Sequence, residues 1–250
     1  MMNRYYSVKS SRRGFLLSAG AILAGLALGG MTGSLRAAET VPQKIGIIGS
    51  GRIGGTLGGL WLKAGHEVMF SSLDLEYDKA LAARLGAGAH AGTPSEAAAF
   101  GEVLLISVPY AALPQLGRDL GDSIKGKVVL DTCNPIPARD GEMANEARAT
   151  GTGVMSARLL PGARLVRAFN SVGYAKLQSE AHRTGERVAI PLVGDDAQAL
   201  STAQRLVQEA GFDAVVVGPL ARAGELDPGT PAFGKALTAV ELRRALTAAP

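Results

Sequence analysis

A glycine-rich turn near the start of the chain constrains the fold more than any other feature. Gly49, Gly51 and Gly54 have the spacing G-x-G-x-x-G, after an apolar run at 44–48 and before a helix-forming stretch through Leu62. In a strand–turn–helix unit these glycines permit a tight turn, close approach of a pyrophosphate and close packing of helix on strand. The anion then lies at the helix N-terminus. The pattern predicts a dinucleotide site; a glycine-rich turn that binds nothing is the alternative.

The rest of the chain alternates short apolar runs with longer stretches rich in Ala and Leu. This alternation is typical of parallel strands joined by crossover helices, and it predicts βαβ units throughout. We therefore expect an α/β fold, a Rossmann-type doubly wound, mostly parallel sheet over residues 43–250 with a small C-terminal lobe from about Arg164. The expected strands are 44–48, 66–70, a weak one near 89, 103–107, 127–131, 164–168, 189–193 and 214–217.

The end of the second strand bears on the choice of dinucleotide. An acid there would bind the ribose 2′-hydroxyl of NAD and repel the 2′-phosphate of NADP. This chain has Ser71 and Ser72 at that position, and Arg52 is near enough in the turn to reach the same side, so NADP is favoured. Asp74, 20 residues past Gly54, is the acid that keeps NAD open as the alternative.

The N-terminal 38 residues have the layout of a targeting segment. They carry five basic and no acidic residues, and four of the basic residues precede an apolar run from Phe15 to Gly30 that is short and glycine-rich for a membrane span. The stretch from Ser11 to Leu17 resembles the twin-arginine consensus. We expect export to the periplasm by the twin-arginine route, with retention of the uncleaved segment as a membrane anchor as the alternative.

The remaining charge excludes one class of partner. Of the 26 basic residues, 21 follow the leader, against 22 acidic residues, so the body is nearly neutral. Nucleic-acid binding needs clustered Lys and Arg, and we reject it. Cys133 is the only cysteine, which excludes an intramolecular disulfide, and we expect a small buried residue there.

Several motifs in order resemble the family of NADP oxidoreductases that act on the deazaflavin coenzyme F420, and the related dinucleotide-binding domain of the STEAP metalloreductases. The likeness covers nearly everything after the leader. Its carriers are Ile47-Ile48-Gly49-Ser50-Gly51-Arg52-Ile53-Gly54-Gly55-Thr56-Leu57, Ala64-Gly65-His66-Glu67-Val68, Val108-Pro109-Tyr110, Asp131-Thr132-Cys133-Asn134-Pro135, Ala168-Phe169-Asn170-Ser171-Val172-Gly173, Val193-Gly194-Asp195-Asp196, Gly211-Phe212-Asp213 and Gly218-Pro219-Leu220. The family commonly has an arginine after the serine that ends the second strand, where this chain has Leu73.

The resemblance implies contacts to the cofactor beyond the glycine turn. Val108, Pro109, Asn134 and Pro135 would line the cleft for nicotinamide and acceptor, at strand ends where α/β proteins bind ligands. For each of them, and for Asn170 and Ser171, a purely turn-forming role is the alternative. The cofactor-binding residues that we expect in all are Gly49, Ser50, Gly51, Arg52, Ile53, Gly54, Ser71, Ser72, Val108, Pro109, Asn134 and Pro135.

The implied activity is hydride transfer between NADP(H) and a deazaflavin, a flavin or a flavin-linked acceptor such as ferric or cupric ion. Such transfer needs stacking and exclusion of water more than a protein acid or base, so we expect no catalytic residue and no metal site. A non-catalytic dinucleotide-binding module and a small hydroxy-acid or imine dehydrogenase are the alternatives. A small-molecule electron acceptor is the expected partner, and the short C-terminal part favours a homodimer.

Overall fold

The structure, a computed structural model, describes residues 41–247, and these residues form one compact unit. The expected twin-arginine segment, residues 1–38, lies outside the described residues. Within residues 41–247, no helix combines the length and the hydrophobicity needed to cross a bilayer.

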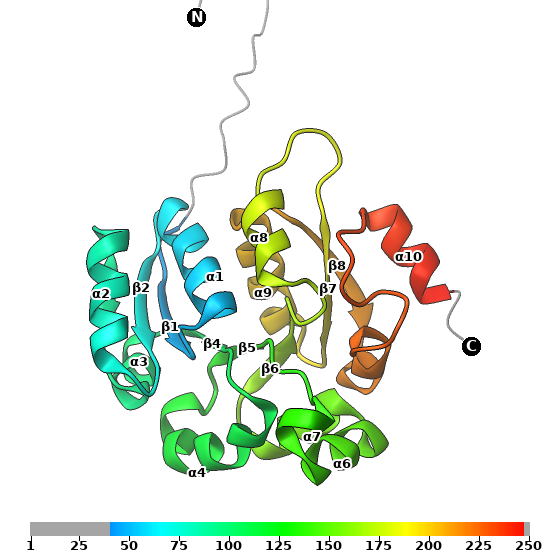
Figure 1. The fold of residues 1–250 in the computed structure, drawn as a ribbon, viewed down its shortest axis with the longest axis horizontal. Coiled ribbons are helices and arrows are strands. Elements are labelled where there is room, and N and C mark those ends of the chain that lie inside the picture. Colours follow the sequence, from blue (N-terminus) through cyan, green and yellow to red (C-terminus); the bar gives the residue numbers. More distant parts are fainter. Residues whose placement is uncertain (1–40, 248–250) are drawn as a thin grey trace, which may run out of the picture. The chain divides into compact units, whose positions relative to one another are not determined.

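The core of the fold is an eight-stranded sheet, which confirms the predicted α/β class (Figure 1). Its strand order is β3-β2-β1-β4-β5-β6-β7-β8. The chain adds β2 and β3 on one side of β1 and all later strands on the other side, so the strand order reverses between β1 and β4. The strands are β1 (Lys44–Ile48), β2 (Glu67–Ser71), β3 (Ala89–Ala91), β4 (Val103–Ile106), β5 (Val128–Asp131), β6 (Arg164–Arg167), β7 (Ala189–Gly194) and β8 (Asp213–Gly218).

The central strands are buried on both faces. All four residues of β4 and all four of β5 are buried, as the continuous apolar run at 103–106 predicts for a parallel sheet. β1 pairs in parallel with β4, and Ile48 lies opposite Ile106 at their carboxyl ends. The glycine turn that follows Ile48 therefore lies at the reversal of strand order.

Helices cover both faces of the sheet. Trp61 and Leu206 belong to the hydrophobic cluster on one face, and Leu120 and Leu226 belong to the cluster on the other. The helices are α1 (Arg52–Lys63), α2 (Leu75–Leu85), α3 (Pro94–Phe100), α4 (Leu113–Ile124), α5 (Pro137–Asp140), α6 (Glu142–Thr150), α7 (Thr152–Leu159), α8 (Tyr174–Glu180), α9 (Ala197–Glu209) and α10 (Ala239–Thr247), with the 3-10 segments η1 (Tyr110–Ala112) and η2 (Leu220–Leu226).

The expectation of parallel βαβ units throughout is wrong at one strand pair. β7 runs antiparallel to β6, and they share only two pairs, Val166 with Gly194 and Arg167 with Val193. A continuous apolar run predicts a strand buried on both faces but carries no information on its direction. The residues after Arg164, for which we expected a small lobe, contribute β6, β7 and β8 to the same sheet, with α10 packed near β7 and β8.

Candidate functional site

The glycine turn has two crowded glycines and one open one. Gly49 has a φ of 98°, and a Cβ there would lie 2.2 Å from the Ser107 carbonyl oxygen. A Cβ on Gly54 would lie 2.1 Å from the Gly49 carbonyl oxygen, whereas a Cβ on Gly51 would meet nothing within 4 Å. Gly49 and Gly54 therefore have the structural roles that the motif predicts, and Gly51 leaves space open above the turn.

The helix that follows the turn has a free N-terminus. Gly51 is the N-cap of α1, and no side chain caps it. The first amides of a helix have no partner within the helix, and together with the helix dipole they attract anions. The loop itself is held in place because the Gly49 and Ser50 amides both donate to the Ser71 carbonyl oxygen, at 2.8 and 3.1 Å. The result is a fixed turn at the point where α/β sheets bind nucleotides, with the helix amides that attract anions left without a side-chain cap.

A cleft of about 260 Å³ opens beside this helix end. It lies at the carboxyl ends of β1, β4 and β5, and it brings together six of the twelve predicted cofactor-binding residues. These six are Gly51, Arg52, Ile53, Val108, Pro109 and Asn134. Residues from three separate strand ends thus meet where the glycine motif predicts the dinucleotide.

The predicted serines have roles inside the protein. Ser71 is fully buried, and its hydroxyl donates to the Ile47 carbonyl oxygen at 2.7 Å. Ser50 is also fully buried, and its hydroxyl donates to the Asp78 carboxylate. Both side chains therefore shape the loop, and contact of Ser50 and Ser71 with a cofactor stays a prediction. Pro135 does not line the cleft within the described part of the chain.

Asp74, the acid that could bind the ribose 2′-hydroxyl of NAD, caps a helix in the structure. It is the N-cap of α2, and its Oδ1 accepts a hydrogen bond from the Tyr77 amide at 3.0 Å. Leu73, where the family commonly has an arginine, is fully exposed.

A second pocket, of about 390 Å³, shares Ile53, Thr132 and Asn134 with the cleft and extends it toward α8. The Asn134 Nδ2 donates to the Asn170 carbonyl oxygen at 2.8 Å, and the Asn170 Nδ2 donates to Asn134 Oδ1 at 3.2 Å. Asn170 is buried, and its Oδ1 has no partner among the described residues. Phe169 beside it has a φ of 59°, an uncommon conformation for a bulky residue. Strained backbone and an unsatisfied polar atom at one place are features of a ligand pocket.

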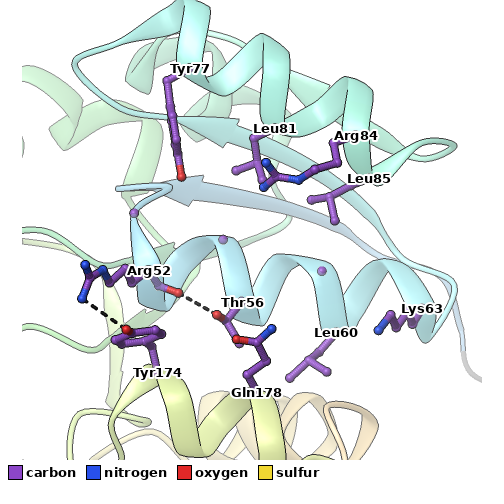
Figure 2. Close-up of a pocket in the computed structure, with 13 residues that line it drawn as sticks. Arg52, Thr56, Leu60, Lys63, Tyr77, Leu81, Arg84, Leu85, Tyr174 and Gln178 are labelled. Atoms are coloured by element: carbon purple, nitrogen blue, oxygen red, sulfur yellow. Dashed lines mark hydrogen bonds between the residues drawn. The ribbon is translucent and has the colours of Figure 1, made fainter.

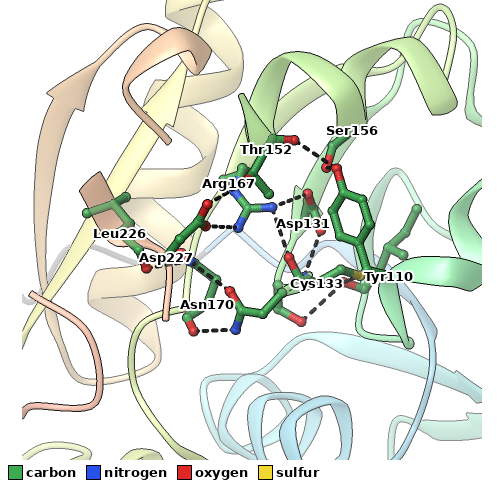
Figure 3. A network of polar contacts seen from close by, with 12 residues as sticks. Tyr110, Asp131, Cys133, Thr152, Ser156, Arg167, Asn170, Leu226 and Asp227 are labelled. Carbon is green, nitrogen blue, oxygen red and sulfur yellow. Dashed lines mark hydrogen bonds and ion pairs between the residues drawn. The ribbon is translucent and has the colours of Figure 1, made fainter. Parts of the chain in front are cut away.

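A buried ion-pair network adjoins the two pockets, since Cys133 lines the cleft and Asn170 lines the second pocket (Figure 3). Arg167 of β6 is fully buried and donates to Asp131 at 3.0 Å, to the Cys133 carbonyl oxygen at 2.9 Å and to Asp227 at 3.2 Å. Burial raises the pKa of Asp227, although the guanidinium opposes this. Because Cys133 directly precedes Asn134, the network fixes the floor of the cleft.

Tyr110 closes this network on the side of α7. Its hydroxyl donates to the Thr152 carbonyl oxygen at 2.9 Å and accepts from Ser156 at 3.2 Å. Burial raises the pKa of Tyr110 to about 12. The phenol therefore remains neutral, and its two hydrogen bonds hold it in one position.

Sequence reasoning missed Tyr174, which joins α8 to the glycine turn (Figure 2). The Arg52 guanidinium lies 4.9 Å from the centre of the Tyr174 ring, and Arg52 Nη1 donates to the Tyr174 hydroxyl at 3.2 Å. Tyr174 lines the second pocket and also a groove of about 410 Å³ along the outer face of α1. Tyr174 is 122 residues from Arg52, and no short motif connects two residues so far apart.

Other candidate chemistry is not assembled at the cleft. Burial raises the pKa of Cys133 well above its usual range, which suits a packed thiol rather than a nucleophile. Residues 41–247 contain no cluster of three or more His, Cys, Asp or Glu side chains able to hold a metal ion. Asp196 is the N-cap of α9, as its position after a strand predicts.

The sheet, its glycine turn and the cleft at the strand ends define a Rossmann-type α/β protein. Residues 44–135 match the family model described as NADP oxidoreductase, coenzyme F420-dependent. The chain is 27% identical over 198 residues to Metalloreductase STEAP3 of Rattus norvegicus, an alignment that covers 78% of this chain and 38% of that protein. It therefore spans well under half the length of that curated relative.

Solved structures show the same fold. A hypothetical protein from Sinorhizobium meliloti superposes with a TM-score of 0.70 at 24% identity, over 79% of this chain and 96% of that one. A protein described as an F420-dependent NADP reductase, from Arthrobacter sp. FB24, has a TM-score of 0.62 at 22% identity, over 73% and 87%. An imine reductase from Myxococcus stipitatus in complex with NADP+ has a TM-score of 0.52 at 20% identity, over 72% and 56%. These likenesses confirm the Rossmann-type fold.

Proposed function

We propose that the protein binds NADP(H) across the glycine turn and the cleft, and that it transfers hydride between the nicotinamide and a deazaflavin, a flavin or a flavin-linked acceptor. The observation that carries this proposal is the open, uncapped N-terminus of α1 at Gly51, facing a cleft lined by residues from three strand ends. The family match over residues 44–135 supports it.

The residues fit a dinucleotide in several respects. Gly51 leaves room for a pyrophosphate, and the α1 amides supply donors for it. Val108 and Pro109 give the cleft an apolar wall where a nicotinamide ring would stack. When bound, the nicotinamide supplies the hydride, and the protein's part is to orient the rings and exclude water.

The acceptor would occupy the second pocket, whose lining is mainly apolar. The half-buried Phe233 and Ile53 offer it apolar surface, while the Asn134 and Asn170 pair offers amide groups at the border with the cleft. A planar ring such as a deazaflavin or flavin fits these features. Reduction of ferric or cupric ion would then proceed through such a ring.

The experiment is an acceptor screen. NADPH oxidation by the full chain is followed with F420, with FMN and FAD, and with ferric and cupric chelates, each alone and with flavin. Asn170→Ala should lower kcat/KM at least tenfold, whereas Glu76→Gln, on the exposed face of α2, should leave it unchanged. Tight NADPH binding without turnover of any acceptor would favour the non-catalytic binding module.

One observation favours a second candidate, a small imine or hydroxy-acid dehydrogenase. Such an enzyme needs a group that protonates the product, and the exposed Lys176 lines the second pocket. The test is turnover of small cyclic imines and hydroxy acids by wild type and Lys176→Met. Turnover that is lost in Lys176→Met would replace the flavin-linked proposal.

Export by the twin-arginine route and homodimerisation are further proposals. The first is supported by the arginine pair Arg12 and Arg13 before an apolar run. Replacement of both arginines by lysine should retain the protein in the cytoplasm, and light scattering of the exported protein should give the mass of a dimer. Export of the double variant, or a monomer, would contradict the respective proposal.

A further inference from the structure

Asp78 is a buried acid that lies directly behind the proposed cofactor site. It is on α2 and is fully buried. Its carboxylate accepts hydrogen bonds from the Ser50 hydroxyl in the glycine turn and from the Ser72 hydroxyl, at 2.8 Å for the latter. No Lys, Arg or His between residues 41 and 247 forms an ion pair with it. A buried carboxylate without a cation is costly, so its presence here calls for a reason beyond packing.

Through the two serines, Asp78 is connected to two parts of the proposed site for the adenosine half of the cofactor. Ser50 belongs to the turn that would hold the pyrophosphate. Ser72 follows the last residue of β2, where Rossmann proteins contact the ribose 2′ position. An NAD-binding protein has an acid on the strand end itself. Here the acid is one helix further along the chain, and it reaches the strand end through the Ser72 hydroxyl.

The hydrogen bond to Asp78 fixes what Ser72 presents to a ligand. A hydroxyl has one proton, and the 2.8 Å bond to Asp78 is shorter than the 3.2 Å distance from Ser72 Oγ to the Asp74 carbonyl oxygen. With its proton directed inward to Asp78 and one lone pair accepting from the Asp74 amide at 3.1 Å, Ser72 has one lone pair left for a ligand. Lone pairs accept from a ribose 2′-hydroxyl but not from a 2′-phosphate, which itself needs donors. The carboxylate charge behind Ser72 acts in the same direction.

We propose that Asp78 sets the cofactor preference through Ser72, as a positioning residue that weakens binding of NADPH relative to NADH. This inference rests on the proposed function, because it assumes that the turn binds a nicotinamide dinucleotide. Asp74 does not have this role, since its carboxylate caps α2 on the exposed side of the loop.

The test is the ratio of dissociation constants, Kd(NADH)/Kd(NADPH), measured by calorimetry on the full chain. Asp78→Asn removes the charge with little change of shape and should raise the ratio about tenfold. Ser72→Ala removes the oxygen that would accept from the ribose 2′-hydroxyl of NADH and oppose the 2′-phosphate of NADPH, so it should also raise the ratio. Glu76→Gln removes one negative charge from the exposed face of the same helix and should leave the ratio within twofold of wild type.

The outcomes separate this inference from the proposed function. Wild type that binds neither dinucleotide overturns both. Wild type that binds, with an unchanged ratio in Asp78→Asn, overturns the inference alone, as does a rise in Asp74→Asn instead. If Asp78→Asn does not fold, Ser72→Ala decides, because a purely structural role for Asp78 would weaken both cofactors equally and leave the ratio unchanged.

Discussion

Arg167 of β6 and Asp131 of β5 form an ion pair in which both side chains are fully buried, with Nη1 and Oδ2 3.0 Å apart. Removal of one partner from a buried pair leaves the other charge uncompensated. We expect Arg167→Met to lower the free energy of unfolding by about 3–5 kcal/mol, because Asp131 and Asp227 would both lose their partner. Urea denaturation of wild type and variant measures this loss in the free energy of unfolding.

A surface ion pair supplies the control for this prediction. Arg183 pairs with Glu180 at 3.0 Å, and both side chains are partly exposed. Arg183→Met should cost less than about 1 kcal/mol. Equal losses in the two variants would contradict the role of the buried network.

The glycine turn predicts a contrast between two alanine substitutions. Gly49→Ala introduces a Cβ that clashes with Ser107 at a φ of 98°, so it should destabilise the protein by about 3 kcal/mol. Gly51→Ala has open space and a φ of −62°, so it should change stability by less than about 1 kcal/mol. Thermal unfolding of both variants checks the contrast, and a destabilised Gly51→Ala would show that the space above the turn is not open.

Most of this architecture follows from local sequence patterns. The glycine spacing predicts the turn, and the local sequence Thr93-Pro94-Ser95-Glu96 forms a full capping box at the start of α3. Six of the predicted cofactor residues meet in one cleft because parallel strands bring their carboxyl ends to one edge. Patterns of this kind are short-range, and they transfer well from sequence to structure.

Long-range contacts account for what sequence did not predict. The pair of Arg52 and Tyr174 spans 122 residues. The sequence does not distinguish Asp78 from a solvent-exposed acid on an amphipathic helix. In the fold it is buried against Ser50 and Ser72. The antiparallel direction of β7 also could not be predicted from the sequence, because a strand buried on both faces has the same apolar pattern in either direction.

His66 makes stability depend on pH. Burial lowers its pKa below 6.5, although Glu209, 3.1 Å from Nε2, opposes the shift. The unfolded chain therefore takes up a proton at a higher pH than the folded protein does. Stability should fall as the pH falls below about 6.5, toward the lower pKa of the folded state. His66→Gln should flatten the melting temperature between pH 7.5 and 5.5; an unchanged pH profile would exclude His66 as its source.

Cys133 should react slowly in the folded protein. Its thiol is buried, and burial raises its pKa well above the usual range, so little thiolate is present or accessible at pH 8. Ellman's reagent should modify it at least tenfold more slowly in the native protein than in 6 M guanidinium chloride, where it is exposed. Equal rates would contradict its packed position beneath the cleft.

The central claim is that the uncapped end of α1 binds the pyrophosphate of NADP(H). Calorimetric titration of the full chain with NADPH, beside Gly51→Asp, tests it most directly, because the added carboxylate would fill the open space at Gly51 and repel the anion. We predict NADPH binding to wild type and its loss in Gly51→Asp, with an unchanged melting temperature for the variant without ligand. Equal binding by both proteins, or no binding by wild type, would contradict the account.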